Sequence, residues 1–143
     1  MDTLGIWSSG RFFYACFEDS VVVFRGTDIG YIMFFNLVCE DIIVFKHRKD
    51  ADGEYISTRF ECSFEDGKLT HIERVKQEEK FTYKQYEEEI YTGEVVEVIE
   101  FDKPVMMDDS RFGLETRDLE SSRILLTIQK RLQLIPEEYR ALL

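Results

Sequence analysis

Tight-turn signals recur about every ten residues along the first hundred residues of the chain. They separate short runs that are rich in aromatic and β-branched residues, and clear examples are Glu18-Asp19-Ser20, Asp50-Ala51-Asp52-Gly53 and Glu65-Asp66-Gly67-Lys68. Glycine and aspartate tolerate the backbone angles of tight turns, so such signals join antiparallel strands into hairpins. The spacing therefore predicts a mainly β fold, an antiparallel up-and-down meander that is either open or closed into a barrel.

The predicted strands cover most of residues 11–101. They are Arg11–Phe17, Ser20–Arg25, Tyr31–Val38, Ile42–Arg48, Glu54–Ser63, Leu69–Val75, Lys80–Tyr91 and Glu94–Phe101. The seventh run mixes strand alternation with the i,i+4 spacing of a helix, and we expect a strand with a bulge or bend near Gln85. Gly26 and Gly30 are expected to supply positive φ in the loop before the third strand.

The last thirty residues change to helical periodicity. Apolar residues repeat at about one turn of a helix, at Ile124, Leu125, Ile128, Leu132 and Ile135. Asp118 is the predicted N-cap of this helix, and Pro136 fits the first turn of a second, short one. We expect one domain over residues 1–143, with a β meander in 1–110 and a helical segment in 111–143 packed against it.

Most of the formal net charge of −11 lies in one block between residues 87 and 109. Against the single base Lys103, this acidic block contains Glu87, Glu88, Glu89, Glu94, Glu97, Glu100, Asp102, Asp108 and Asp109. A field of one sign attracts a cationic partner and speeds its encounter. The same acidity disfavours nucleic acids and anionic membrane surfaces as partners.

Three cysteines, Cys16, Cys39 and Cys62, recur 23 residues apart, each close to a Glu-Asp turn. The pattern favours a small apolar residue in a two-strand repeat over a metal site, because thiolate metal sites need close-set pairs. An odd number of cysteines, together with an acidic start that lacks an export signal, predicts a cytoplasmic protein. The apolar runs are too short for the ~20 residues that span a bilayer.

Catalytic and cofactor motifs are absent from the sequence, which has neither a glycine-rich phosphate loop nor a Gly-x-Ser-x-Gly element. His47 lies at a basic strand end, and His71 shares a predicted strand face with Glu73. An enzyme could use His71, Glu97 or Glu100, but the sequence places no nucleophile beside them. We expect no enzymatic activity, no cofactor and no bound metal.

The opening Leu4-Gly5-Ile6-Trp7, followed by aromatic meander strands, resembles the calycin (lipocalin-like) β-barrel superfamily over roughly residues 4–135. In that superfamily a Gly-x-Trp on the first strand closes one end of the barrel, and a helix follows the last strands. The resemblance implies that Trp7 plugs the base, with a basic residue of the tail such as Arg123 packed near it. Thr27-Asp28 comes earlier than the Thr-Asp element of the family.

Two functional hypotheses remain open, and neither predicts an oligomeric state. The chain is similar to bacterial immunity proteins in being short, acidic and free of catalytic motifs. This resemblance would make it an interaction protein that masks a basic protein such as a nuclease toxin. Its predicted contacts are Glu87, Glu88, Glu89, Glu94, Asp102, Asp108 and Asp109. The alternative is a lipocalin-like barrel that binds a small apolar ligand in a cavity lined by Phe12, Tyr14, Phe24, Tyr31, Phe34 and Phe45.

Overall fold

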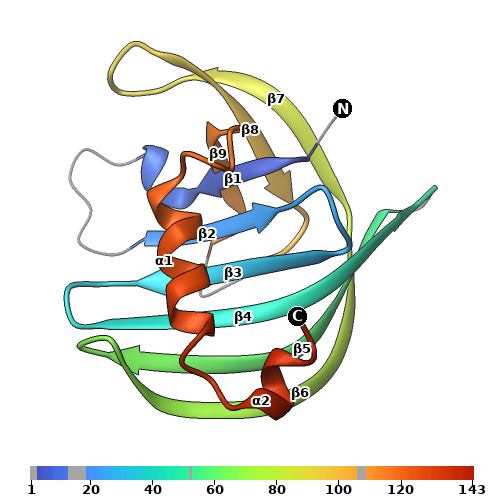
Figure 1. Cartoon of the computed structure of the whole chain (residues 1–143). Coiled ribbons are helices and arrows are strands. Elements are labelled where there is room, and N and C mark those ends of the chain that lie inside the picture. The colour runs from blue at the N-terminus through green and yellow to red at the C-terminus, as the bar shows by residue number, and fades with distance from the viewer. Residues whose placement is uncertain (1–2, 13–18, 52, 106–108) are drawn as a thin grey trace.

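One antiparallel sheet of nine strands, with two short helices after it, makes up the fold in the computed structural model (Figure 1). The structure describes residues 3–12, 19–51, 53–105 and 109–143. The strands are β1 (Gly5–Ser8), β2 (Asp19–Phe24), β3 (Ile29–Phe35), β4 (Cys39–Asp50), β5 (Gly53–Glu65), β6 (Lys68–Phe81), β7 (Tyr83–Glu89), β8 (Val95–Phe101) and β9 (Arg111–Thr116). The helices are the 3₁₀ helix η1 (Ser9–Phe12), α1 (Arg123–Leu132) and α2 (Glu137–Arg140). The prediction of a mainly antiparallel β fold with a C-terminal helix is confirmed.

The sheet is curled but is not closed into a barrel. Its strand order is β6-β5-β4-β3-β2-β1-β9-β8-β7, so the two edge strands, β6 and β7, are consecutive in the chain and separated only by Thr82. This long segment pairs with β5 along its first half and with β8 along its second half, and it runs up one side of the molecule in Figure 1. β6 and β7 are not paired with each other, so the strand order stays open at both ends and the barrel alternative is wrong.

The predicted bulge or bend near Gln85 is wrong, because β7 pairs with β8 there without a register shift; the strand is instead interrupted at Thr82. The backbone N–H of Thr82 donates to the Asp102 carboxylate (3.0 Å), and the backbone N–H of Asp102 donates to the Thr82 carbonyl (2.9 Å). These two hydrogen bonds hold the corner at which the segment stops pairing with β5 and begins to pair with β8.

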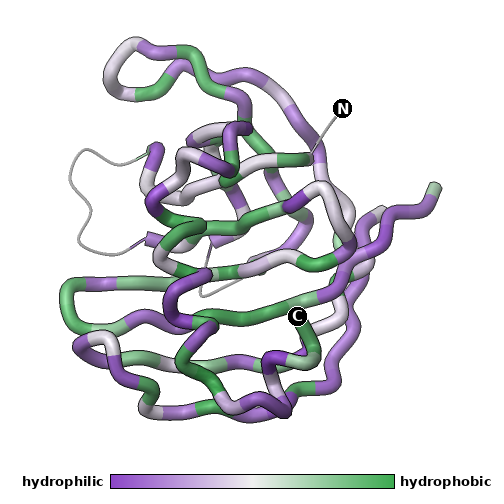
Figure 2. Tube along the Cα trace, viewed as in Figure 1, coloured by the Kyte–Doolittle hydropathy of each residue, from purple (hydrophilic) through white to green (hydrophobic). Residues whose placement is uncertain are grey.

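Both faces of the central strands are buried, because successive side chains of a strand point to opposite sides. One face packs against α1, which crosses the front of β1 to β4 in Figure 1 through Leu125, Ile128 and Leu132. The other, inner face lies inside the curl and carries Trp7, Val22, Phe24, Ile32, Phe45, Ile56, Phe81, Ile99, Phe101 and Phe112. Figure 2 shows the consequence: hydrophobic residues dominate the central strands, whereas the projecting β4–β5 hairpin is hydrophilic.

Two predicted elements differ in the structure. Arg11 lies in η1 and not in a strand, because the backbone N–H of Gly10 turns back to the Ser8 hydroxyl (3.0 Å); residues 13–17 of that predicted strand lie outside the described residues. Residues 111–116, assigned to the helical segment, form β9 between β1 and β8. The sheet therefore continues beyond the predicted boundary at residue 110.

The helix and turn predictions are partly confirmed. Leu125, Ile128 and Leu132 of α1 are buried as expected, and Ile124 is half-buried. Ser122 and not Asp118 caps the helix, accepting from the Leu125 N–H (3.2 Å). Asp118 instead accepts from the Ser121 hydroxyl in the preceding turn (2.7 Å). The Asp66-Gly67 turn is confirmed, with φ of 50° and 75°. Neither Gly26 nor Gly30 has a positive φ, so that prediction is wrong.

Candidate functional site

The hairpin of β7 and β8 carries most of the acidic block and lies at the top of the molecule in Figure 1. Glu87 is paired in register with Glu97, and Glu89 with Val95. Strand alternation therefore places Glu87, Glu89, Val95 and Glu97 on one face of the hairpin. The Glu88 side chain points to the opposite face, as its place between two exposed glutamates requires.

Arginines from other parts of the chain neutralise three acids of the block. Glu88 pairs with Arg111 (2.7 Å), Glu97 pairs with Arg117 (2.5 Å), and Glu94 pairs with Arg11. The Tyr86 hydroxyl donates to Glu100 (2.8 Å), and this hydrogen bond lowers the pKa of Glu100. These acids are engaged within the molecule, so they contribute less to an outward negative field than the sequence suggests.

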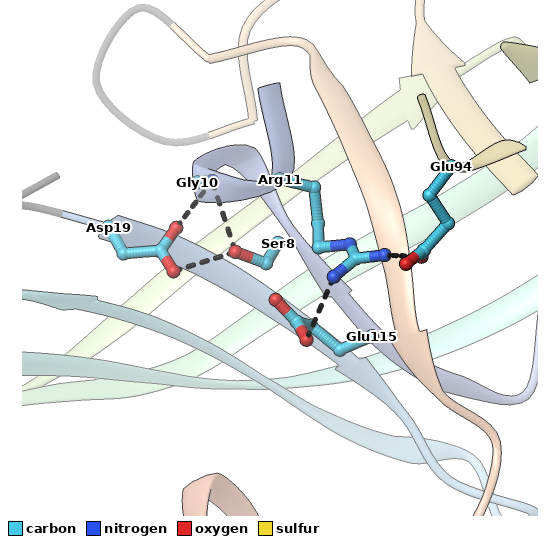
Figure 3. Close-up of polar contacts among 6 residues, drawn as sticks. All are labelled: Ser8, Gly10, Arg11, Asp19, Glu94 and Glu115. Carbon is cyan, nitrogen blue, oxygen red and sulfur yellow. Dashed lines mark hydrogen bonds and ion pairs between the residues drawn. The ribbon is translucent and has the colours of Figure 1, made fainter. Parts of the chain in front are cut away.

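Arg11 ties the hairpin to the body of the protein, as Figure 3 shows. Its guanidinium contacts Glu94 on one side and lies 3.9 Å from Glu115 of β9 on the other. Partial burial raises the pKa of Glu115, and the charge of Arg11 opposes that rise. In the same view, Asp19 accepts from the Ser8 hydroxyl (2.6 Å) and from the Gly10 N–H (2.9 Å). This polar group fixes η1 against β2 and has a structural role.

The remaining acids of the predicted contact set lie elsewhere. Asp102 directly follows β8 and holds the corner at Thr82, so it is separated from the hairpin turn by the length of the strand, roughly 20 Å. The Asp109 carbonyl accepts from Val105 in the loop beyond that corner (3.0 Å). Asp108 lies outside the described residues. The predicted set is therefore not one continuous surface.

Two apolar residues complete the exposed face of the hairpin. Tyr91 is 56% exposed in the turn, and Val95 is 58% exposed at the start of β8. Among the described residues, neither Glu87 nor Glu89 forms an ion pair. We call Glu87, Glu89, Tyr91 and Val95 the hairpin surface. Sequence reasoning missed its apolar half, because the strand pattern of Glu94–Phe101 does not distinguish an exposed valine from a buried one.

The six aromatics predicted to line a cavity do not lie together. Phe24 and Phe45 are buried on the inner face, but Tyr31 is buried on the face that α1 covers. Phe12 packs against the β7–β8 hairpin, Phe34 is half-buried, and Tyr14 lies outside the described residues.

A small cavity lies on the inner face, between Val105 and the strands β3, β4, β5 and β6. Its volume is about 120 Å³, and it is lined by Ile32, Ile43, Ile56, Thr58, Gln77, Glu79, Phe81 and Val105. Ligand pockets usually measure about 300–1,000 Å³. The described inner face is therefore mainly solid core.

Trp7 is fully buried on the inner face, and its indole N–H donates to the Thr3 carbonyl (2.8 Å). The basic residue near it is Arg117, whose guanidinium lies 5.7 Å from the ring centre. Arg123, the residue suggested from the calycin resemblance, is instead the first residue of α1. A basic residue of the tail does lie near Trp7, and it is Arg117 instead of the suggested Arg123.

A buried histidine–glutamate pair was not visible in the sequence. His47 Nδ1 lies 2.6 Å from an oxygen of Glu54, which is only 2% exposed, and the imidazole packs edge-on against Phe24 and Phe45. The other ring nitrogen is buried and has no hydrogen-bond partner among the described residues. Within the described part of the chain, no hydroxyl or thiol is hydrogen-bonded to this nitrogen for the pair to activate.

Glu61, His71 and Glu73 bring three potential metal ligands together at the β5–β6 edge. Their ligand atoms lie within 4.8 Å of one another, and Glu61 is directly opposite Glu73 in the ladder. A hydrogen bond shared with Glu73 raises the pKa of Glu61. A carboxylate and imidazole set of this kind could hold a divalent cation.

Replacing Glu73 with glutamine should stabilise the protein by about 0.5 kcal/mol near neutral pH, because opposed like charges destabilise a ladder. A carboxyl whose pKa is raised in the folded state contributes stability at low pH and loses it as the pH rises through that pKa. The gain from Glu73→Gln should therefore vanish toward acidic pH, where Glu61 is protonated. Urea unfolding across the pH range measures this, with exposed Glu65→Gln as the control. If Glu73→Gln still stabilised the protein at acidic pH, repulsion between Glu61 and Glu73 would not be the cause of the gain.

No described helix is long and apolar enough to cross a membrane. Comparisons of the chain with protein-family models, curated proteins and solved structures found no match.

Proposed function

We propose that this protein is a non-enzymatic binding protein that recognises a basic protein partner through the hairpin surface. One observation carries the proposal: Tyr91 and Val95 are exposed on a projecting hairpin, beside two glutamates that form no ion pair among the described residues. Arginines neutralise Glu88, Glu94 and Glu97, so Glu87 and Glu89 are left as the glutamates of this hairpin without an ion pair among the described residues.

The two halves of the hairpin surface have separate physical roles. Tyrosine is enriched at protein interfaces, because it buries a large apolar ring at a small cost in side-chain entropy. Glutamates at the rim act mainly on the rate of association, since their field steers a cationic surface into contact. The nucleic-acid cleft of a nuclease toxin has the required positive charge, and the carboxylates would occupy it in place of phosphates.

Affinity capture from the native host, followed by mass spectrometry, identifies the partner. The association rate is then measured for the wild type and for the variant Glu87→Lys/Glu89→Lys. We expect the variant to associate about tenfold more slowly at low salt, and we expect the difference to shrink as salt screens the charges. Tyr91→Ala should instead speed dissociation.

The matched control is Glu65→Lys/Glu138→Lys, which changes net charge by the same amount at exposed sites. Glu65 ends β5 and Glu138 lies in α2, both far from the hairpin in Figure 1. The proposal fails if the captured partner is neutral or acidic, or if the two double variants associate at the same rate.

A further inference from the structure

A second feature lies at the opposite end of the sheet, where the ladder between β5 and β6 is interrupted. The register skips between Thr58 and Phe60 on β5 and between Gln77 and Arg74 on β6. A pocket of about 430 Å³ occupies this bulge, and it is lined by Ser57, Thr58, Arg59, Arg74, Val75, Lys76, Gln77, Glu78 and Leu142. Bulges interrupt strand pairing and redirect side chains, and they are frequent beside binding sites.

The charge of this pocket is opposite to that of the protein. Arg59, Arg74 and Lys76 line it, and no described carboxylate forms an ion pair with any of them. Its one acid, Glu78, already accepts from the Ser57 hydroxyl (2.7 Å) and lies 3.7 Å from Arg48. In a chain of net charge −11, three uncompensated cations in one pocket are an unusual concentration.

One of these cations is incompletely satisfied. The Nε–H of Arg59 is buried and has no hydrogen-bond acceptor among the described residues. A buried donor of a charged group is costly to leave unpaired, so the site favours a ligand that brings an acceptor. The Arg74 guanidinium lies 5.8 Å from the Tyr139 ring centre, and this contact helps to hold it at the pocket.

We infer that this pocket binds a small organic phosphate monoester. A monoester carries about −1.5 to −2 charges at neutral pH, which suits three cations and one engaged acid better than a single carboxylate does. The planar donors of arginine match phosphate oxygens in pairs. Val75 and Leu142 offer apolar contacts to the organic group, and the volume lies in the range of small-molecule sites.

The test is titration of the wild-type protein with phenyl phosphate, inorganic phosphate and benzoate, followed by amide chemical shifts. We expect phenyl phosphate to bind most tightly, with shifts at Thr58, Arg59 and Lys76. Inorganic phosphate tests whether the phosphate group binds without an apolar part. Benzoate tests whether an aromatic compound with a single negative charge binds as well.

Arg59→Ala and Arg74→Ala should each weaken phenyl phosphate binding about tenfold or more, because a charge-assisted hydrogen bond is lost. Lys76→Ala, at an exposed position, should weaken binding without a risk to folding. Arg123→Ala, at the exposed start of α1, is the control and should bind as the wild type does.

The inference is overturned if the wild type binds none of the three compounds. It is also overturned if Lys76→Ala and the arginine variants bind phenyl phosphate as tightly as Arg123→Ala. The hairpin variant Glu87→Lys/Glu89→Lys should retain the phosphate site, so this inference and the proposed partner binding can fail independently.

Discussion

Replacing His47 with leucine should lower the free energy of unfolding by about 3 kcal/mol, because the change leaves the buried Glu54 carboxylate without its partner. Breaking a buried pair is costly, since the remaining charged or polar group keeps its desolvation penalty. We place the loss at the low end of the usual range because Lys49 lies directly opposite Glu54 in the ladder. Urea unfolding of the wild type and the variant measures the effect.

The matched control is the double variant His47→Leu/Glu54→Leu, which removes both polar groups and fills the site with apolar side chains beside Phe24 and Phe45. It should recover most of the lost stability, because two well-packed hydrophobic residues can replace a buried pair with little cost. Two results would contradict this: a single variant as stable as the wild type, or a double variant no more stable than the single one. Either result would show that an unpaired Glu54 side chain does not destabilise the protein.

Much of the fold could be predicted from local signals in the sequence. Asp66-Gly67 specifies its turn through backbone angles alone, and Ile128 and Leu132 mark the buried side of α1 through their spacing. The position of β9 beside β1 could not be predicted, because that pairing joins residues more than a hundred positions apart. For the same reason, nothing in the sequence shows that β6 and β7 become opposite edges of one sheet.

The candidate site illustrates the same limit. The alternation of Glu87, Glu88 and Glu89 between the two faces of the hairpin follows from strand geometry alone. The pairing of Glu94 with Arg11 joins residues 83 positions apart, so the sequence cannot reveal that this acid is neutralised. A count of charges in the sequence therefore overstates the negative field of the acidic block.

Replacing Gly30 with alanine should destabilise the protein by roughly 3 kcal/mol, at the upper end of the range for overpacking a core. Gly30 lies inside β3 with Phe24 and Phe45 as its two cross-strand neighbours, and the two rings meet edge-on above it (centroids 6.0 Å apart). A Cβ atom at this position would lie 2.4 Å from the Phe45 ring and 2.8 Å from the Val23 carbonyl oxygen. The residue is therefore a glycine because of space and not because of its φ, and urea unfolding measures the loss.

Gly26→Ala is the matched control, because a Cβ there would meet no atom within 4 Å and the position is exposed with no positive φ. Its effect should stay within about 0.5 kcal/mol of zero. In a Phe45→Leu background, Gly30→Ala should lose about 1 kcal/mol less than in the wild type, since one of its two clashes is relieved. The Val23 carbonyl belongs to the backbone and cannot move away, so the rescue should be partial. Equal losses in the two backgrounds would show that the Phe45 ring is not what excludes a side chain at residue 30.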